Sequence, residues 1–315
     1  MSNGSFPPTP RRLGGTLVIV LAVLAPVCFA GWLVWRSMSE DDAKAAGAPS
    51  GASSAPSLVP NGGGKQGVSG SPGASAQPQS PAPSRAPAKN ALRGKVVVVD
   101  PGHNPRNRDH TADIARTVDV GTHRKECDTT GTATNSGYAE ATFTLDVSRR
   151  VRTLLSERGA TVKLTQNDDR PYGPCVDERA AIGNEAHADA AVSVHADGAG
   201  AGQRGFHVIL PASVRGGGAD TSAITGPSRR LGNRLVRGFT EATQSAPANY
   251  LGGGEGLTVR DDLGGLNLST VPKVFIECGN MRDSKDAALL TDAHWRQRAA
   301  RGIADGITDF LLGKR

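Results

Sequence analysis

Short apolar runs alternate with segments of helical periodicity over the last two thirds of this 315-residue chain. Runs rich in β-branched and other apolar residues predict buried strands at residues 95–99, 161–165, 190–194, 206–210 and 273–277. Apolar residues spaced three or four apart predict helices at 140–158, 176–188 and 222–243, with one or two more within 287–312. Strands that alternate with helices are typical of parallel sheets. The predicted fold is therefore α/β, a single domain whose mostly parallel, twisted sheet is flanked by helices on both faces.

The beginning of the chain has a different pattern, a continuous apolar segment at residues 16–35. Twenty such residues are enough to cross a hydrocarbon core of about 30 Å. Arg11 and Arg12 precede the segment, and the positive-inside rule then keeps residues 1–12 in the cytoplasm. We expect residues 13–36 to form a transmembrane anchor, with the rest of the chain outside the cytoplasm.

The same segment leaves a cleaved signal peptide open as an alternative. Cys28-Phe29-Ala30 is an acceptable cleavage site for a signal peptidase, which requires small residues. Cleavage would make the protein secreted, whereas an uncleaved segment would keep it at the cell membrane. Both alternatives export the remainder of the chain.

Residues 37–92 are rich in Ala, Gly, Ser and Pro and have almost no large apolar side chains. Such a segment cannot bury enough surface to offset its conformational entropy, so we expect a disordered linker. Flexible-coil scaling gives it a root-mean-square span of about 40 Å. The folded domain is then expected at residues 93–315.

The net charge of the chain argues against nucleic acid as a partner. The formal charge is +6, but basic residues exceed acidic ones by four before residue 91, which leaves the domain at about +2. Aromatic residues make up only 4% of the chain, and the domain has no stripe of Lys and Arg. We therefore expect no nucleic-acid binding, and we expect a monomer.

Three candidate catalytic side chains lie at the ends of predicted strands. His103 follows Asp-Pro-Gly after the first strand, His195 directly follows the third, and Glu277 ends the last. The carboxyl ends of parallel strands share one edge of a sheet, where ligand crevices form. Glu140, at the start of the first predicted helix, completes a set of two imidazoles and two carboxylates. Two imidazoles and one carboxylate suit a zinc site with an open position, and the other carboxylate could transfer protons.

Taken singly, each of these residues also fits a structural role. Each histidine could be a solvated turn residue, and Glu140 could be a first-turn glutamate stabilised by the helix dipole. Glu277 could form a surface salt bridge. The order and context of all four residues decide between the alternatives.

An ordered series of motifs surrounds these residues, beginning with Val-Val-Asp-Pro-Gly-His at 98–103. The others lie at residues 179–184, 188–197, 205–206, 260–263 and 271–280. From about residue 94 to residue 312 the chain resembles the zinc-dependent N-acetylmuramoyl-L-alanine amidases of bacterial cell walls, the amidase 3 family. The resemblance implies a hydrolase that acts on peptidoglycan and cleaves the amide bond between N-acetylmuramic acid and L-alanine of the stem peptide.

The resemblance also implies roles for the four residues. His103, Glu140 and His195 are expected to bind one zinc ion per chain, and Glu277 is expected to be the catalytic residue that shuttles the proton. The remaining histidines are expected to lie outside the metal site: His110, His123, His187, His207 and His294.

Two further residues are candidates for supporting roles. We expect Asp100 to orient a histidine ligand, because such ligands usually donate their other N–H to a carboxylate or carbonyl. Arg260 is a candidate for binding a substrate carboxylate, with a structural ion pair to an aspartate as the alternative. The chain departs from the family at Asp197, where Asn is common, and at residues 279–281.

A 36-residue insertion at 104–139 joins two of the expected ligands. We interpret it as a flap over the cleft, with a disordered surface loop as the alternative, and residues 129–134 could form a hairpin within it. Cys127 in the insertion and Cys175 in a second loop are expected to form a disulfide in an oxidising compartment. Cys278 directly follows a buried strand and is expected to remain a free core thiol.

Two other functions remain open at this point. One is a non-catalytic peptidoglycan-binding regulator with the same fold, and the other is a zinc peptidase that cuts within the stem peptide. The zinc-protease motifs His-Glu-x-x-His and His-x-x-Glu-His are absent from the chain, which argues against those peptidase classes.

Overall fold

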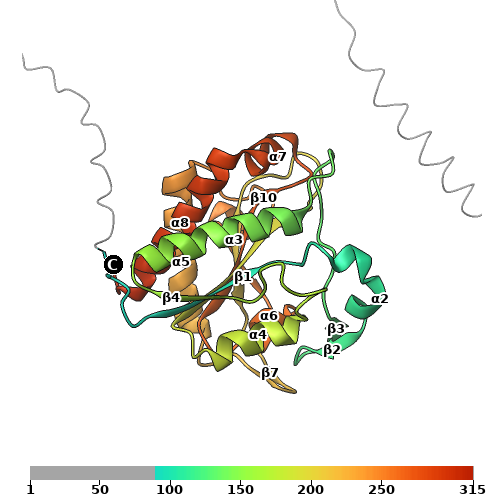
Figure 1. The fold of residues 1–315 in the computed structure, drawn as a ribbon, viewed down its shortest axis with the longest axis vertical. Coiled ribbons are helices and arrows are strands. Elements are labelled where there is room, and N and C mark those ends of the chain that lie inside the picture. Colours follow the sequence, from blue (N-terminus) through green and yellow to red (C-terminus); the bar gives the residue numbers. More distant parts are fainter. Residues whose placement is uncertain (1–88, 315) are drawn as a thin grey trace, which may run out of the picture. The chain divides into compact units, whose positions relative to one another are not determined.

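The computed structural model describes residues 89–314, which are built around one six-stranded sheet in the order β4-β1-β5-β10-β6-β9 (Figure 1). The strands are β1 (Val96–Pro101), β4 (Thr161–Leu164), β5 (Ala190–Asp197), β6 (His207–Pro211), β9 (Leu257–Arg260) and β10 (Lys273–Asn280). β4, β1, β5 and β10 run parallel to one another. β6 pairs antiparallel with β10, and β9 runs parallel to β6. The predicted mostly parallel sheet is confirmed.

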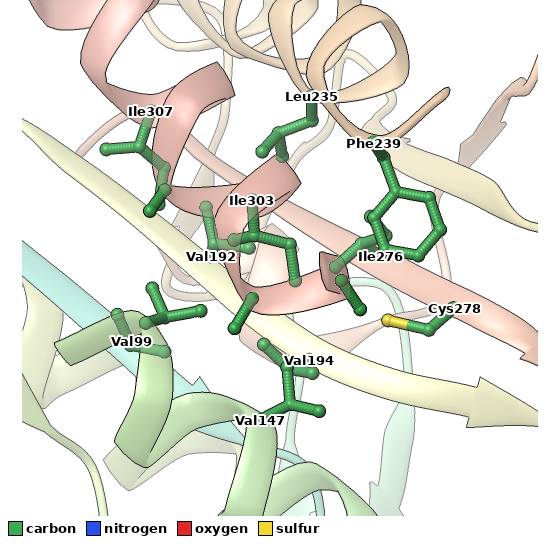
Figure 2. Close-up of a cluster of buried hydrophobic side chains, with 14 of the residues drawn as sticks. Val99, Val147, Val192, Val194, Leu235, Phe239, Ile276, Cys278, Ile303 and Ile307 are labelled. Atoms are coloured by element: carbon green, nitrogen blue, oxygen red, sulfur yellow. The ribbon is translucent and has the colours of Figure 1, made fainter. Parts of the chain in front are cut away.

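Alternate residues of the central strands pack against opposite faces of the sheet. Val97 and Val99 of β1 belong to the larger core, whereas Val98 belongs to a smaller one. The larger core lies between the sheet and the helices α3 (Glu140–Glu157), α5 (Thr225–Thr243) and α8 (Ala293–Leu311). Figure 2 shows its centre, formed by Val99, Val192, Val194 and Ile276 of the strands with Val147, Leu235, Phe239, Ile303 and Ile307 of the helices.

The other face of the sheet is covered by α4 (Val176–Glu185) and α6 (Gly264–Asn267). Val98 and Ala191 pack there, with Ile182 of α4 beside them. Helices therefore flank both faces, as expected. The remaining elements are η1 (Asn107–Asp109), α2 (Thr111–Ile114), β2 (Thr117–Asp119), β3 (Arg124–Glu126), β7 (Arg215–Gly216), β8 (Ala219–Asp220), η2 (Gly252–Gly254) and α7 (Ser284–Thr291).

The insertion at residues 104–139 is ordered and contains η1, α2, β2 and β3. Val118 and Val120 are buried with Cys127 and with the partly buried Val176 at the start of α4. The insertion thus forms a small layer of its own beside α4 and α6, to the right of the sheet in Figure 1. The alternative of a disordered surface loop is wrong for this segment.

The hairpin expected at residues 129–134 is also wrong. The hairpin of the insertion is β2 with β3, and the later segment has only an isolated bridge between Ala133 and Ala139. Backbone groups of residues 129–134 instead contact side chains of the candidate site, for example Thr132 N–H with Glu140. Tertiary contacts have overridden the β propensity of the threonines.

Two expected boundaries differ from the structure. Leu92, expected in the linker, is fully buried, and its N–H donates to the carbonyl of Arg158. Its apolar side chain extends the core past the end of α3. Helix α4 ends at Glu185 and not at residue 188 as expected, so His187 lies in a turn with a φ of 45°.

Between residues 89 and 314, no helix is long and apolar enough to span a membrane. The expected cytoplasmic segment 1–12, the anchor 13–36 and most of the linker 37–92 lie outside the described residues.

Candidate active site

The topology brings His103, Glu140 and His195 together at the carboxyl edge of the sheet. His103 follows β1 in a left-handed conformation (φ 61°), Glu140 is the first residue of α3, and His195 lies in β5. One oxygen of Glu140, Oε1, lies 3.0 Å from His195 Nδ1 and 3.3 Å from His103 Nε2. One potential ligand atom from each residue lies within 4.8 Å of the others. Two nitrogens and one oxygen at these separations suit a single metal ion.

Each imidazole has its second nitrogen occupied on the side away from this cluster. His103 Nδ1 lies 3.1 Å from the carbonyl oxygen of Thr129, and His195 Nε2 lies 3.2 Å from Ser193 Oγ. A histidine that ligates a metal needs its other ring nitrogen held in this way. This pattern leaves Nε2 of His103 and Nδ1 of His195, the two nitrogens that face Glu140 Oε1, as the ring atoms available to a metal.

Close packing fixes the rings and the carboxylate. The His195 ring stacks on Phe275, with centroids 5.1 Å apart and an interplanar angle of 7°. Gly102 covers its other side, where a Cβ atom would overlap the ring. Gly131 is also restricted, since a Cβ there would lie 2.8 Å from Glu140 Oε2. These two glycines permit the close approach that the site requires.

Glu277 shares the cavity with the three candidate ligands. It lies in β10 directly opposite His195 of β5. The cavity measures about 520 Å³ and is also lined by the insertion. Among residues 89–314, the enclosed Oε2 atom of Glu277 has no hydrogen-bond partner. Burial, helped by the negative charges of Glu140 and Asp197, raises the pKa of Glu277 well above its usual range.

The expected direct contact between Asp100 and a histidine is absent. The Asp100 carboxylate is fully buried and accepts from Arg179 Nη1 at 2.7 Å. It also accepts from Ser193 Oγ at 2.8 Å, and only through this hydroxyl does it reach His195. The prediction of a direct partner is wrong because the carboxylate turns inward to the buried cations and not outward to the sheet edge.

Arg260 lies at the cavity wall but already has a partner. Its guanidinium forms a bidentate ion pair with Asp262, with N···O distances of 2.7 and 2.5 Å. This is the structural ion pair that the sequence left open. Asp197, the departure from the family pattern, also lines the cavity and accepts from the hydroxyl of Tyr250 at 2.7 Å.

The other histidines lie outside the cluster, as expected. His110 contacts Asp113 at 3.0 Å, and His123 contacts Thr122 at 2.8 Å, both within the insertion. His207 is buried in β6, and His294 is exposed in α8.

The expected disulfide between Cys127 and Cys175 is present, and Cys278 is a free, buried thiol. Cys127 immediately precedes Asp128, which lines the cavity, and Cys175 caps the start of α4. The disulfide therefore attaches the insertion to the helix beside the site.

Several contacts of the site were not predicted from the sequence. The carbonyl of Thr129 and the N–H of Thr132, which contact His103 and Glu140, belong to a loop with no recognisable motif. Ser193 had a detectable signal, since residues two apart on a strand face the same side and it lies two before His195.

Comparisons with known proteins identify the family. The family model described as N-acetylmuramoyl-L-alanine amidase, Amidase_3, matches residues 97–309. The N-acetylmuramoyl-L-alanine amidase Rv3717 of Mycobacterium tuberculosis is 41% identical over 222 residues, which cover 70% of this chain and 88% of that protein.

Solved structures show the same relationship. The N-acetylmuramyl-L-alanine amidase Ami1 from Mycobacterium smegmatis matches with a TM-score of 0.65 and 39% identity, over 71% of this chain and 99% of that one. The catalytic domain of CwlV, an N-acetylmuramoyl-L-alanine amidase from Bacillus (Paenibacillus) polymyxa, matches with a TM-score of 0.51 and 25% identity, over 69% and 98% of the two chains. Because the family model covers more than half of the chain and these relatives are matched over most of their length, the chain belongs to the N-acetylmuramoyl-L-alanine amidase family Amidase_3.

Proposed function

We propose that this protein is a zinc-dependent hydrolase that cleaves the amide bond between N-acetylmuramic acid and L-alanine in peptidoglycan. The proposal rests on one observation: His103, Glu140 and His195 converge in one cavity with Glu277, whose buried Oε2 atom has no hydrogen-bond partner among the described residues. The relative with 41% identity is named as an amidase of this specificity, which supports the choice of substrate.

The donor set suits zinc. Two imidazole nitrogens and one carboxylate oxygen are a typical ligand set of catalytic zinc sites, which keep one position open. The contacts of His103 with Thr129 and of His195 with Ser193 orient both rings toward the shared space. We propose that these residues hold one zinc ion per chain.

The proposed reaction is hydrolysis by general acid–base catalysis. Glu277 takes a proton from the attacking water, whose oxygen bonds to the lactyl carbonyl carbon. Glu277 then returns the proton to the nitrogen of L-alanine as the C–N bond breaks. When bound, zinc supplies Lewis acidity to the carbonyl oxygen and makes the water a stronger acid. The raised pKa of Glu277 suits a group that must hold a proton between two steps.

Arg260 remains a candidate for binding a substrate carboxylate. Its guanidinium lines the cavity, and its side chain is 45% exposed, so an incoming anion can reach it. To bind such a group bidentately, Arg260 would exchange Asp262 for the substrate.

We also propose that the domain works outside the cytoplasm as a monomer. The apolar segment at 13–36 would anchor it to the cell membrane, and the residues between that segment and the folded domain would let it reach the wall. Cleavage of the segment would release it. The disulfide between Cys127 and Cys175 supports an oxidising compartment.

Digestion of purified peptidoglycan, followed by mass spectrometry of the products, tests the proposal. We expect stem peptides that begin with L-alanine and glycan chains with free lactyl carboxylates. Cuts within the stem peptide would establish a peptidase instead. A zinc-loaded protein that binds peptidoglycan and releases nothing would be a non-catalytic regulator.

A further inference from the structure

Four buried charges lie beneath the two candidate histidine ligands. We call Arg179, Asp100, Asp128 and Lys273 the Arg179 cluster; their side chains are 5%, 0%, 6% and 1% exposed. Arg179 Nη1 lies 2.7 Å from Asp100 Oδ1, and Nη2 lies 2.9 Å from Asp128 Oδ2. Lys273 Nζ lies 3.3 Å from Asp100 Oδ2. The two cations and two carboxylates neutralise one another, so removal of one leaves a buried charge unpaired.

One branch of the cluster leads to His103. Asp128 Oδ1 lies 3.5 Å from His103 Nδ1 and accepts the N–H of Thr129 at 2.8 Å. The carbonyl oxygen of Thr129 is the nearer partner of His103 Nδ1, at 3.1 Å. Asp128 therefore supports the first imidazole in two ways, through its own carboxylate beside Nδ1 and through its hold on the backbone N–H of Thr129, the residue whose carbonyl oxygen contacts the ring.

The other branch leads to His195. The Ser193 hydroxyl donates to Asp100 Oδ2 at 2.8 Å, so its only hydrogen points away from His195. The Ser193 oxygen can then only accept, and it lies 3.2 Å from His195 Nε2. Nε2 must consequently carry a proton, so Nδ1, which lies 3.0 Å from Glu140 Oε1, is the ring atom available to a metal.

The two branches meet at one guanidinium. Arg179 is a planar fork whose nitrogens hold Asp100 and Asp128 at a fixed separation. Its orientation is set by two carbonyl oxygens, Pro174 O accepting from Nε at 2.9 Å and Pro101 O accepting from Nη1 at 2.7 Å. A lysine at this position would keep the charge but could not bridge both carboxylates with the same geometry.

From this arrangement we infer that Arg179 is a positioning residue that orients both histidine ligands at once, through Asp128 and Thr129 for His103 and through Asp100 and Ser193 for His195. The inference rests on the proposed zinc site. Its consequence is that zinc affinity depends on residues that do not touch the metal. Loss of one branch leaves one imidazole without its orienting contact, and loss of Arg179 affects both imidazoles.

The competing interpretation is that the cluster only stabilises the fold. Thr165 provides a matched control, because its hydroxyl donates to the same carboxylate, at 2.6 Å from Asp100 Oδ1, and leads to neither histidine. Thr165→Val removes a buried hydrogen bond from Asp100, as Ser193→Ala does, while both branches stay intact.

The test measures the zinc dissociation constant of the full chain by competition with a chelator, together with thermal unfolding of the metal-free protein. We expect Ser193→Ala and Arg179→Lys to weaken zinc binding by roughly 10- to 100-fold, as is usual when the support of a metal ligand is lost. We expect Thr165→Val to lower the unfolding temperature and to bind zinc like the wild type.

Three outcomes would count against the inference. Folded Ser193→Ala and Arg179→Lys proteins that bind zinc as tightly as the wild type would overturn it and leave the proposed function intact. A Thr165→Val protein that loses as much affinity as Ser193→Ala would make the cluster purely structural. A wild type that binds no zinc would overturn the proposed function as well.

Discussion

Two glutamates in the same cavity have opposite environments at the residue scale. Burial alone would raise the pKa of Glu140, but His103 and the hydrogen bonds from both histidines outweigh it and hold the pKa well below its usual range. Glu140 also accepts the N–H groups of Thr132 and Ala196. Glu277 has no such partners for Oε2, and burial raises its pKa. Their different surroundings thus suit Glu140 to be an ionised ligand and Glu277 to carry a proton.

The environment of Glu277 leads to a prediction for Glu277→Gln. The amide is nearly isosteric with the carboxyl group, so the variant should fold and retain one zinc per chain. Its turnover should fall by roughly 10² to 10⁴, the usual contribution of a general acid–base group. Steady-state kinetics on a muropeptide and metal analysis check both parts, with Glu140→Gln as the matched variant that should lose zinc. Activity within a few-fold of wild type would make Glu277 a bystander, and loss of zinc would make it a ligand.

His207 leads to a prediction about the pH dependence of stability. Burial, together with Arg260 and against the opposing charge of Asp197, lowers its pKa to about 4. Below pH 6.5 an unfolded histidine gains a proton that the folded His207 does not accept until the pH approaches 4. The folded protein should therefore lose stability as the pH falls through this window, by up to about 3 kcal/mol from this residue.

The measurement compares the free energy of unfolding of metal-free wild type and His207→Phe between pH 7 and pH 4. The stability difference should shift in favour of the variant as the pH falls, because phenylalanine cannot be protonated. Curves that run parallel over the whole range would contradict a buried, neutral His207.

Single residues also show how far the sequence could predict the site. His103, His195 and Glu277 stood out because they lie at the ends of predicted strands, and their roles were implied by the ordered motifs that resemble the amidase 3 family. The roles of Thr129 and Thr132 could not be found, since backbone groups of a non-local loop have no signature in the sequence. Asp100 was placed beside the site correctly, but it reaches His195 through Ser193 and not directly, and the sequence does not show that Arg179 approaches it from α4.

The insertion is the feature that matters most at the scale of elements. Its hairpin packs beside α4 and α6, and its last segment returns across the cavity to Glu140. The disulfide with Cys175 fixes the start of this last segment at Cys127, one residue before Asp128. The insertion is thus a wall of the cavity, and it supplies contacts to two of the three candidate ligands.

Removal of the disulfide should destabilise the protein. Cys127 and Cys175 are 48 residues apart, and closing a loop of this length stabilises by about 4 kcal/mol in the chain-entropy model. A protein with both cysteines changed to alanine should therefore unfold at a lower urea concentration than the wild type. Non-reducing peptide mapping of the wild type should recover this one linkage with Cys278 free. A linkage to Cys278, or three free thiols in protein isolated from its own compartment, would contradict the prediction.

The elements that the sequence did not predict share a physical cause. Strand β9 (Leu257–Arg260) has no fully buried residue and two exposed ones, so it lacks the apolar run that marks β5 or β10. The hairpin strand β3 is Arg-Lys-Glu, which has no strand signal at all. Both strands are stabilised by pairing with a neighbouring strand, β9 with β6 and β3 with β2. The apolar periodicity of a single segment does not show such pairing. The long helices and the buried central strands were predicted because their pattern is strong and local.

The whole molecule combines a folded domain with a segment of at least 88 preceding residues, within which the apolar run lies. If residues 13–36 are an uncleaved anchor, the full chain should sediment with membranes and resist extraction at alkaline pH, whereas residues 37–315 produced alone should stay in the supernatant. Cell fractionation checks this prediction. A full-length product found in the soluble fraction would contradict anchoring, and a product shortened near Ala30 would establish cleavage.

Zinc titration of the metal-free full chain, with turnover of a defined muropeptide as the readout, tests whether His103, Glu140 and His195 form a catalytic zinc site. We expect activity to rise with added zinc and to saturate at one zinc per chain, with release of a peptide that begins with L-alanine. His195→Ala should show neither binding nor activity at the same zinc concentrations, whereas His294→Ala, which changes an exposed histidine outside the cluster, should match the wild type. Full turnover without metal, or wild-type zinc affinity in His195→Ala, would contradict the account.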